Sequence, residues 1–261
     1  MTDEDFITEL FCRIDDALMD VGKHSQANLY PSEVVTIAFL FALKGGHGRA
    51  FYRWLGKNWR HLFPTVPCRT RLFRQFVSHQ HLTAQFMADP TILGVIDSYG
   101  IELIHPVREG RSEKQIGKKG ISNHRWIVGG KLCLLLNKFG LIVDWDFDAA
   151  NAYDAVFHPL IEAVIDKMIV LADSHFHAAH GDPANLKICP RGAWNDRMVI
   201  ETVLSMLTTI SGFKKVFHRT WPQFQARLAY TMSLFNILAQ WHGLPAEDDG
   251  FVPLSIAEFS L

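Results

Sequence analysis

The hydrophobic pattern of the chain changes once, near Asp89-Pro90, and this change limits what the chain can fold into. Before that point, apolar residues recur every three or four positions, which predicts amphipathic helices. After it comes the short apolar run Ile92-Leu93-Gly94-Val95-Ile96, followed by Asp97-Ser98, which is typical of a buried strand that ends at an acidic residue. We therefore predict two domains, residues 1–90 and residues 91–261.

The first ninety residues contain four segments with helical spacing, at residues 3–21, 34–44, 49–59 and 69–86. Pro31-Ser32-Glu33 precedes the second segment and Gly45-Gly46 follows it, and these are residue types that begin and end helices. The sequence thus predicts an all-helical N-terminal module.

The rest of the chain alternates strand-like and helix-like segments. Two strand-like runs, at residues 126–136 and 141–147, flank the turn Asn137-Lys138-Phe139-Gly140, which predicts a hairpin that pairs with the first strand. Helical spacing covers residues 154–166, 193–207 and 213–243, and short strand-like runs cover residues 168–171 and 186–189. The predicted order is three strands, helix, strand, helix, short strand and helix, which is an α/β fold with a mixed sheet flanked by helices.

Three acidic residues hold related positions in this order. Asp97 ends the first strand, Asp173 follows the strand at residues 168–171, and Glu201 lies in the helix at residues 193–207. A cluster of carboxylates repels itself unless a divalent cation lies among it, and hard oxygen ligands suit Mg²⁺ or Mn²⁺. Two such ions, roughly 3.5 to 4 Å apart, activate the attacking oxygen and stabilise the leaving oxygen in phosphoryl transfer. We expect a metal site at one edge of the sheet and a phosphodiester substrate.

Basic residues are unevenly distributed, although the formal net charge is -1. Residues 34–88 contain no Asp or Glu, and aromatic side chains such as Tyr52 and Trp54 lie between the cations. The pattern favours contacts to DNA phosphates, which position DNA without reading its sequence, over a merely solvated face. The cations of this basic block are Lys44, Arg49, Arg53, Lys57, Arg60, Arg69, Arg71 and Arg74.

A second basic group lies in the Gly- and Lys-rich stretch after the first strand. Its members are Lys114, Lys118, Lys119 and Arg125. We predict a flexible loop here that approaches bound DNA, and the alternative is an exposed loop that serves only solubility.

The ordered acids and their neighbours resemble the DDE transposases of bacterial insertion sequences, and the resemblance covers nearly the whole chain. Val95-Ile96-Asp97-Ser98 is similar to the family's first aspartate strand, and Val170-Leu171-Ala172-Asp173-Ser174 to its second. The most specific match is the Arg-x-x-x-Glu spacing of Arg197 and Glu201, which places both residues on one helix face.

The resemblance implies an RNase H-like catalytic core in which Asp97, Asp173 and Glu201 bind Mg²⁺ or Mn²⁺ and carry the chemistry. Arg197 would support Glu201 or contact a phosphate. The implied activity is hydrolysis of phosphodiester bonds at transposon ends and joining of the freed 3′-hydroxyl to target DNA. The implied partner is double-stranded DNA, both transposon ends and target, bound by a homodimer or higher oligomer.

The sequence departs from the family pattern in two places. Ser174-His175-Phe176 follows Asp173 where the family often has a Lys-Gly-Tyr-like segment, and no basic residue lies about two turns after Glu201, although Lys214 and Lys215 lie further along. These departures leave open a catalytically inactive DNA-binding relic of a transposase.

Two other acid or histidine groups leave further alternatives open. His175, His177 and His180 suggest a histidine-containing metallo-phosphoesterase that binds Zn²⁺ or Mn²⁺, although their spacing matches no zinc signature. Asp144, Asp146 and Asp148 alternate along a strand, so they share a face and are a second possible metal-ligand set.

The chain begins with the acidic Met1-Thr2-Asp3-Glu4-Asp5, and its longest apolar stretch, residues 34–43, is about half as long as a membrane-spanning helix. We therefore expect a cytoplasmic protein.

Overall fold

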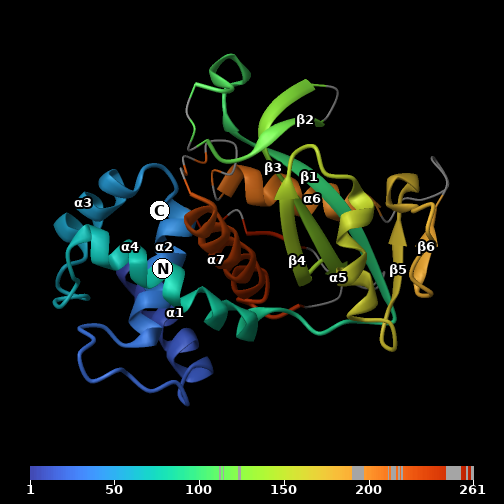
Figure 1. Ribbon diagram of the computed structural model, residues 1–261. Coiled ribbons are helices and arrows are strands. Elements are labelled where there is room, and N and C mark those ends of the chain that lie inside the picture. The colour runs from blue at the N-terminus through green and yellow to red at the C-terminus, as the bar shows by residue number, and fades with distance from the viewer. Residues whose placement is uncertain are drawn as a thin grey trace.

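The structure is a computed structural model that describes most of the chain and has a mixed sheet beside a group of helices (Figure 1). The described residues are 1–111, 113, 115–122, 125–189, 197–210, 212, 216, 218, 220–244, 254–256 and 258–259, without the side chains of residues 197 and 198. Lys114 of the second basic group lies outside this part, as do Lys214 and Lys215, the basic residues that follow Glu201 at a distance.

The N-terminal helices form where the sequence predicts them. They are α1 (Asp3–Ala17), α2 (Pro31–Lys44), α3 (Gly48–Asn58) and α4 (Arg69–His79), and α4 continues into the 3-10 helix η1 (Gln80–Phe86). The backbone N–H of Tyr30 donates to Glu33 at 2.7 Å where α2 begins, and α2 ends at Gly45, whose φ of 68° favours glycine. Almost every residue of α2 is buried, so α2 is the central helix of the group.

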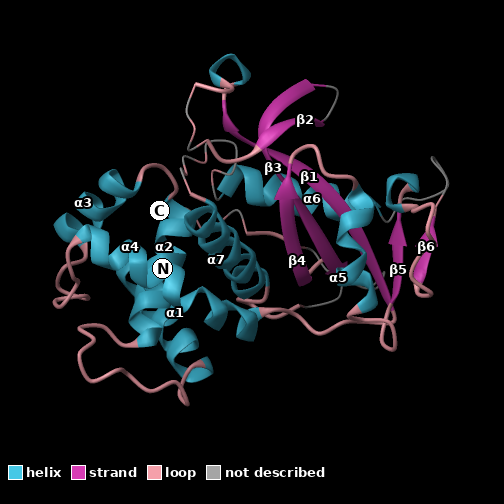
Figure 2. Cartoon of the chain, viewed as in Figure 1, coloured by secondary structure: helices cyan, strands magenta, loops and turns pink. Residues whose placement is uncertain are grey.

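One more helix packs against these N-terminal helices, and it comes from the C-terminal part of the sequence. Helix α7 (Trp221–Ala239) contacts α2, α4 and η1, and it lies between the N-terminal helices and the sheet (Figure 2). One hydrophobic cluster contains Phe39 of α2, Leu228 of α7 and strand residues such as Leu134. The helices and the sheet therefore share a core, and the division into residues 1–90 and 91–261 stays a prediction.

The sheet combines antiparallel and parallel pairing. Its strands are β1 (Leu93–Ile104), β2 (Lys118–Ser122), β3 (Arg125–Asn137), β4 (Ile142–Ala149), β5 (Ile169–Ala172) and β6 (Leu186–Ile188). The order is β2-β3-β1-β5-β6, and β4 also pairs with β3. Strand β3 is antiparallel to β1, β2 and β4, while β1, β5 and β6 are parallel. The α/β class, the mixed sheet and the β3–β4 hairpin are confirmed.

The turn between β3 and β4 has the geometry that its sequence predicts. The Asn137 side-chain oxygen accepts hydrogen bonds from the backbone N–H groups of Phe139 and Leu141, at 3.0 and 3.1 Å. Gly140 follows with a φ of 77°, a conformation that residues with a Cβ rarely adopt. These contacts fix the hairpin register.

Two predictions about the strands are wrong. Strand β1 does not end at Asp97 but continues to Ile104, because it pairs with β3 along its whole length. Residues 118–122, predicted as part of a flexible loop, form strand β2. Gly120 permits this strand, since a Cβ there would lie 2.0 Å from the backbone oxygen of Ala150.

Two helix predictions also need correction. The segment at residues 154–166 forms only the short 3-10 helix η3 (Asp154–Phe157) and the five-residue α5 (His158–Glu162). The helix predicted between β5 and β6 is a single 3-10 turn, η4 (Ser174–Phe176). Asp173 starts that turn by accepting the N–H of His175, so the chain turns at once instead of continuing into a helix.

Different helices pack against the two faces of the sheet. Val95 and Leu134 belong to the cluster that includes Ile200 and Val203 of α6 (Arg197–Ile210), whereas Ile96 and Leu135 belong to the cluster that includes Ile161 of α5. Figure 1 accordingly shows α5 in front of the sheet and α6 behind it. Among the described residues, no helix has the length and apolar composition needed to cross a membrane.

Candidate functional site

The parallel pairing of β1 with β5 brings two of the predicted acids together. Gly94 lies opposite Val170 and Val95 opposite Leu171, which is the last pair of this ladder. Because Asp173 keeps an extended backbone directly after β5, the same register continued for two residues would bring Asp97 and Asp173 side by side. Neighbouring strands lie about 4.8 Å apart, and residues in register point to the same face. Because Val95 faces α6, Asp97 and Asp173 also lie on the face that α6 covers.

Backbone contacts hold both carboxylates of this pair. The Oδ1 atom of Asp97 accepts the N–H of Ser98 at 2.8 Å, and the Oδ1 atom of Asp173 accepts the N–H of His175 at 2.9 Å. The Nδ1 atom of His175 lies 3.0 Å from Asp173 Oδ2. The Asp173 side chain is 21% exposed and Asp97 is partly buried, so both carboxylates are oriented yet reachable from the surface.

The third predicted acid, Glu201, has a different environment. Helix α6 buries Ile200, Val203 and Leu207, and Glu201 is exposed on its flank, about 100° around the helix from Ile200. Arg197 begins α6, but its side chain lies outside the described part, so its pairing with Glu201 stays a prediction. In the described ranges, no three His, Cys, Asp or Glu side chains are grouped so that they could hold a metal ion.

The histidines after Asp173 do not form a site of their own. His175 pairs with Asp173, whereas the Nδ1 atom of His177 lies 2.8 Å from Asp182 Oδ2, and His180 is exposed. The hydrogen bond from the N–H of Ala178, with that from His177, lowers the pKa of Asp182. Because separate acids hold the two rings, the geometry counts against a shared histidine-metal site.

Asp144, Asp146 and Asp148 lie on the opposite face of the sheet from Asp97. Asp144 pairs with Leu135 and Asp146 with Cys133, and both partners belong to the cluster around α5. Each of the three carboxylates accepts the backbone N–H of the residue that follows it. Burial raises the pKa of Asp144 and of Asp146. These acids therefore form a group separate from the Asp97–Asp173 pair.

The sequence reasoning missed a polar cluster behind Asp97. The Lys131 ammonium donates to Asp154 Oδ1 at 2.9 Å and to the backbone oxygen of Ala152 at 2.6 Å, and the Ser98 hydroxyl donates to the same Asp154 oxygen at 2.7 Å. The Lys131 and Asp154 side chains are only 16% and 13% exposed. The sequence feature that could have predicted this cluster is Lys131, a lone cation within a long apolar strand, because a buried charge requires a partner. The cluster ties β1 and β3 to the start of η3.

The basic block is a surface feature of the N-terminal helices. All eight of its side chains are exposed on or beside α3 and α4. The Lys44 ammonium lies 5.1 Å from the centre of the Trp54 ring, and Arg71 donates to the backbone oxygen of Gln26. Contacts to DNA phosphates require side chains that are exposed in this way. The side chains of a merely solvated face are exposed to the same degree.

The second basic group is more ordered than a loop. Lys118 and Lys119 lie on β2, and Arg125 begins β3. Lys119 lies 3.7 Å from Glu109 and Arg125 lies 4.0 Å from Glu102. The predicted flexible loop is thus corrected to the edge of a three-stranded ribbon made by β2, β3 and β1.

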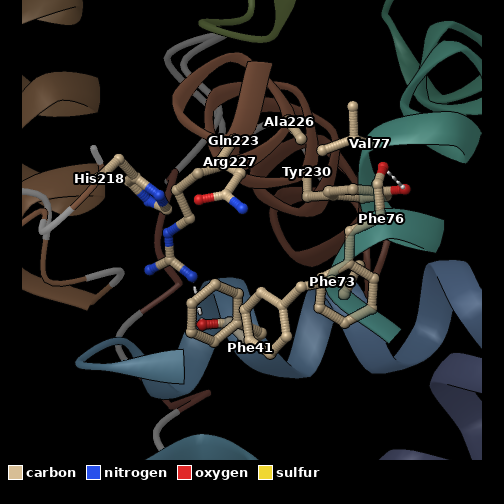
Figure 3. A pocket seen from close by; sticks show the side chains of 10 residues that line it. Phe41, Phe73, Phe76, Val77, His218, Gln223, Ala226, Arg227 and Tyr230 are labelled. Atoms are coloured by element: carbon tan, nitrogen blue, oxygen red, sulfur yellow. Dashed lines mark hydrogen bonds between the residues drawn. The ribbon is translucent and has the colours of Figure 1, made fainter. Parts of the chain in front are cut away.

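A small cavity of about 20 Å³ lies among α2, α4 and α7 (Figure 3). Phe41, Phe73 and Tyr230 line it, and Arg227 and His218 lie at one side. Burial lowers the pKa of Arg227 to about 9, and burial followed by the charge of Arg227 lowers the pKa of His218 to about 4. The Arg227 guanidinium donates to the backbone oxygens of Phe41 and Ala42, at the end of α2. The cavity is too small for a substrate, and its polar groups serve the helix packing.

Comparison of the chain with protein-family models, with curated proteins and with solved structures finds no match in any of the three.

Proposed function

We propose that the chain is a metal-dependent DNA transposase with an RNase H-like catalytic core. The observation that carries the proposal is the parallel register of β1 and β5, which, continued past Val95 and Leu171, would set Asp97 beside Asp173 on one face of the sheet. The strand pattern supports it as well, with β4, β3 and β1 antiparallel and β1, β5 and β6 parallel. Helix α6, which carries Glu201, contacts β1 on the face of that acid pair.

The donor set of the pair fits Mg²⁺ or Mn²⁺. Asp97 and Asp173 offer carboxylate oxygens, which these hard cations prefer, and two adjacent carboxylates lose their mutual repulsion when a cation lies between them. In this proposal Asp97 and Asp173 hold the metal and Glu201 completes the set from α6. The bound ions would activate the attacking oxygen and stabilise the leaving oxygen of a phosphodiester.

The chain's own residues prepare the site for this role. The backbone N–H groups of Ser98 and His175 hold one oxygen of each carboxylate, so the acids are oriented before a metal arrives. The cluster of Lys131, Asp154 and Ser98 anchors β1 to β3 from the opposite face. A rigid support of this kind limits the reorganisation needed when the charge of the reacting phosphate changes.

The DNA contacts in the proposal come from two surfaces. The exposed cations on α3 and α4, without any acid in residues 34–88, would bind phosphates of the transposon end. Lys118, Lys119 and Arg125 would contact DNA from the ribbon beside the sheet. A homodimer or higher oligomer would hold two ends at once, and light scattering with end DNA tests that part, since a persistent monomer contradicts it.

Cleavage and joining of DNA test the proposal. The substrate is a labelled duplex of the DNA that flanks the coding sequence of the chain, supplied intact and as a pre-cut end, with Mg²⁺ or Mn²⁺. We expect the wild-type protein to nick the intact duplex and to join the pre-cut 3′-hydroxyl to a plasmid, and Asp97→Asn and Asp173→Asn to do neither. Asp144→Asn, on the other sheet face, is the matched control and should remain active. Nicking without joining would remove the joining half of the proposal.

A second candidate is a DNA-binding relic that has lost the chemistry. The exposure of Glu201 and the position of the His175 ring against Asp173 favour it. Binding of the flanking duplex with no metal-dependent cleavage by the wild-type protein would support this candidate over the enzyme.

A further inference from the structure

The ribbon formed by β2 and the adjoining parts of β1 and β3 carries an exposed apolar pair. Strand β2 lies at the top of Figure 1, away from α1–α4. Ile121 on β2 lies directly opposite Trp126 on β3, and the two residues are 59% and 57% exposed. Cross-strand partners point to the same face, so the pair forms one small apolar surface.

One cation shares the face of this pair. The Lys119 ammonium lies 5.2 Å from the centre of the Trp126 ring, and Lys119 and Ile121 alternate on β2, so both side chains share the face of Trp126. Lys118 and Arg125 are one residue out of phase with Lys119 and Trp126, so they point to the opposite face of the ribbon. The surface formed by Lys119, Ile121 and Trp126, the ribbon patch, therefore combines an aromatic ring, an aliphatic side chain and a cation.

We propose that the ribbon patch binds DNA by stacking an unpaired base on Trp126, with Lys119 contacting an adjacent phosphate. This inference rests on the proposed function for its choice of DNA as the partner. Aromatic faces beside cations are the surfaces on which bases stack, and Lys119 already shows that the Trp126 ring attracts a cation. The ring is thus placed to stack a base while Lys119 contacts the backbone beside it.

The size of the patch argues against a protein partner. A stable interface buries about 800 Å² on each partner, far more than the exposed parts of two side chains provide. A polyanion that needs one aromatic contact fits the patch better than a second protomer does.

The position of the patch relates it to the Asp97–Asp173 pair. Trp126 precedes Leu134, the partner of Asp97, by eight residues on β3, which is about 26 Å along a strand. This length corresponds to about eight base pairs of duplex DNA. Trp126 would therefore hold a base well away from the cleaved bond, and its loss should weaken DNA binding without affecting the metal site.

The test is the affinity for a fluorescent 20-nucleotide oligo(dT), measured by anisotropy in EDTA so that the metal site plays no part. We expect Trp126→Ala to weaken binding about five- to a hundred-fold and Trp126→Phe to keep most of the affinity. Tyr153→Ala, which removes an aromatic side chain that is 87% exposed, is the matched control and should bind like the wild-type protein.

Equal affinity of Trp126→Ala and the wild-type protein overturns the inference, as does a wild-type protein that does not bind the oligonucleotide. Loss of self-association in Trp126→Ala with unchanged DNA affinity also overturns it and assigns the patch to a second copy of the chain. Mn²⁺ binding that is intact in Trp126→Ala and lost in Asp97→Asn separates failure at the ribbon from failure of the proposed metal site.

Discussion

Single carboxylates in this fold differ in what their surroundings do to them. Asp97 and Asp173 accept backbone hydrogen bonds and lie at a reachable edge of the core, whereas Asp144 lies on the face packed against α5. Burial raises the pKa of Asp144, and its hydrogen bond from the N–H of Trp145 only partly opposes that shift. Compared with the unfolded chain, the folded state therefore shifts Asp144 toward its protonated form.

The raised pKa of Asp144 makes the stability of the folded state depend on pH. Protonated Asp144 makes its full contribution to the stability of the folded state at a pH below the pKa of the unfolded state. That contribution is lost as the pH rises through the higher pKa of the folded state. We expect Asp144→Asn to raise the melting temperature at pH 7 and to leave it nearly unchanged at pH 3, because an amide oxygen can still accept the N–H of Trp145. Thermal unfolding followed by circular dichroism measures this, with the exposed Asp16→Asn as control. A lower melting temperature at pH 7 would contradict it.

Among the secondary-structure elements, α2 depends on a residue from the far end of the chain. The guanidinium of Arg227 on α7 donates to the backbone oxygens of Phe41 and Ala42, which are carbonyls of the last turn of α2. Both carbonyls belong to buried residues, so no water replaces the guanidinium if it is removed.

We expect Arg227→Met to lower the free energy of unfolding by about 1 to 3 kcal/mol, because the Ala42 carbonyl loses its donor while the Phe41 oxygen still accepts the N–H of Gly45. Arg227→Lys should lose less, because an ammonium still donates to one of the two oxygens. Urea denaturation measures the change, with Arg71→Met as control because Arg71 is exposed and donates to a single backbone oxygen. Equal stability of Arg227→Met and Arg71→Met would show that Arg227 does not hold the end of α2.

The elements that the sequence predicted well have a local cause. The β3–β4 hairpin follows from apolar runs around Asn137 and Gly140, and α2 from Pro31 before and Gly45 after a continuous apolar stretch. Strand β2 was missed because Lys118-Lys119-Gly120-Ile121-Ser122 has one apolar side chain, and it forms only because β3 offers a partner edge. The single turn η4 replaced a predicted helix because Asp173 follows β5 directly and accepts the N–H of His175.

For the whole molecule, the candidate site depends on pairing between segments distant in the sequence. The apolar runs predicted that strands would carry Asp97 and Asp173, but a run of Val, Ile and Leu does not specify which strands are neighbours or in what register. Such a run also does not specify the sheet face on which Asp144 and Asp146 lie. The pairing of β4 with β3 places both acids on the face opposite Asp97. The exposure of Glu201 likewise follows from how α6 packs Ile200 and Val203 against the sheet.

The most direct test of the central claim is Mn²⁺ binding by calorimetry to the wild-type protein and to Asp97→Asn, Asp173→Asn and Asp144→Asn. A site shared by two carboxylates must lose affinity when either ligand loses its charge. We predict that Asp97→Asn and Asp173→Asn each lose Mn²⁺ affinity and that Asp144→Asn, on the opposite face, binds like the wild-type protein. Unchanged binding in Asp97→Asn and Asp173→Asn would contradict a metal site between these two strands.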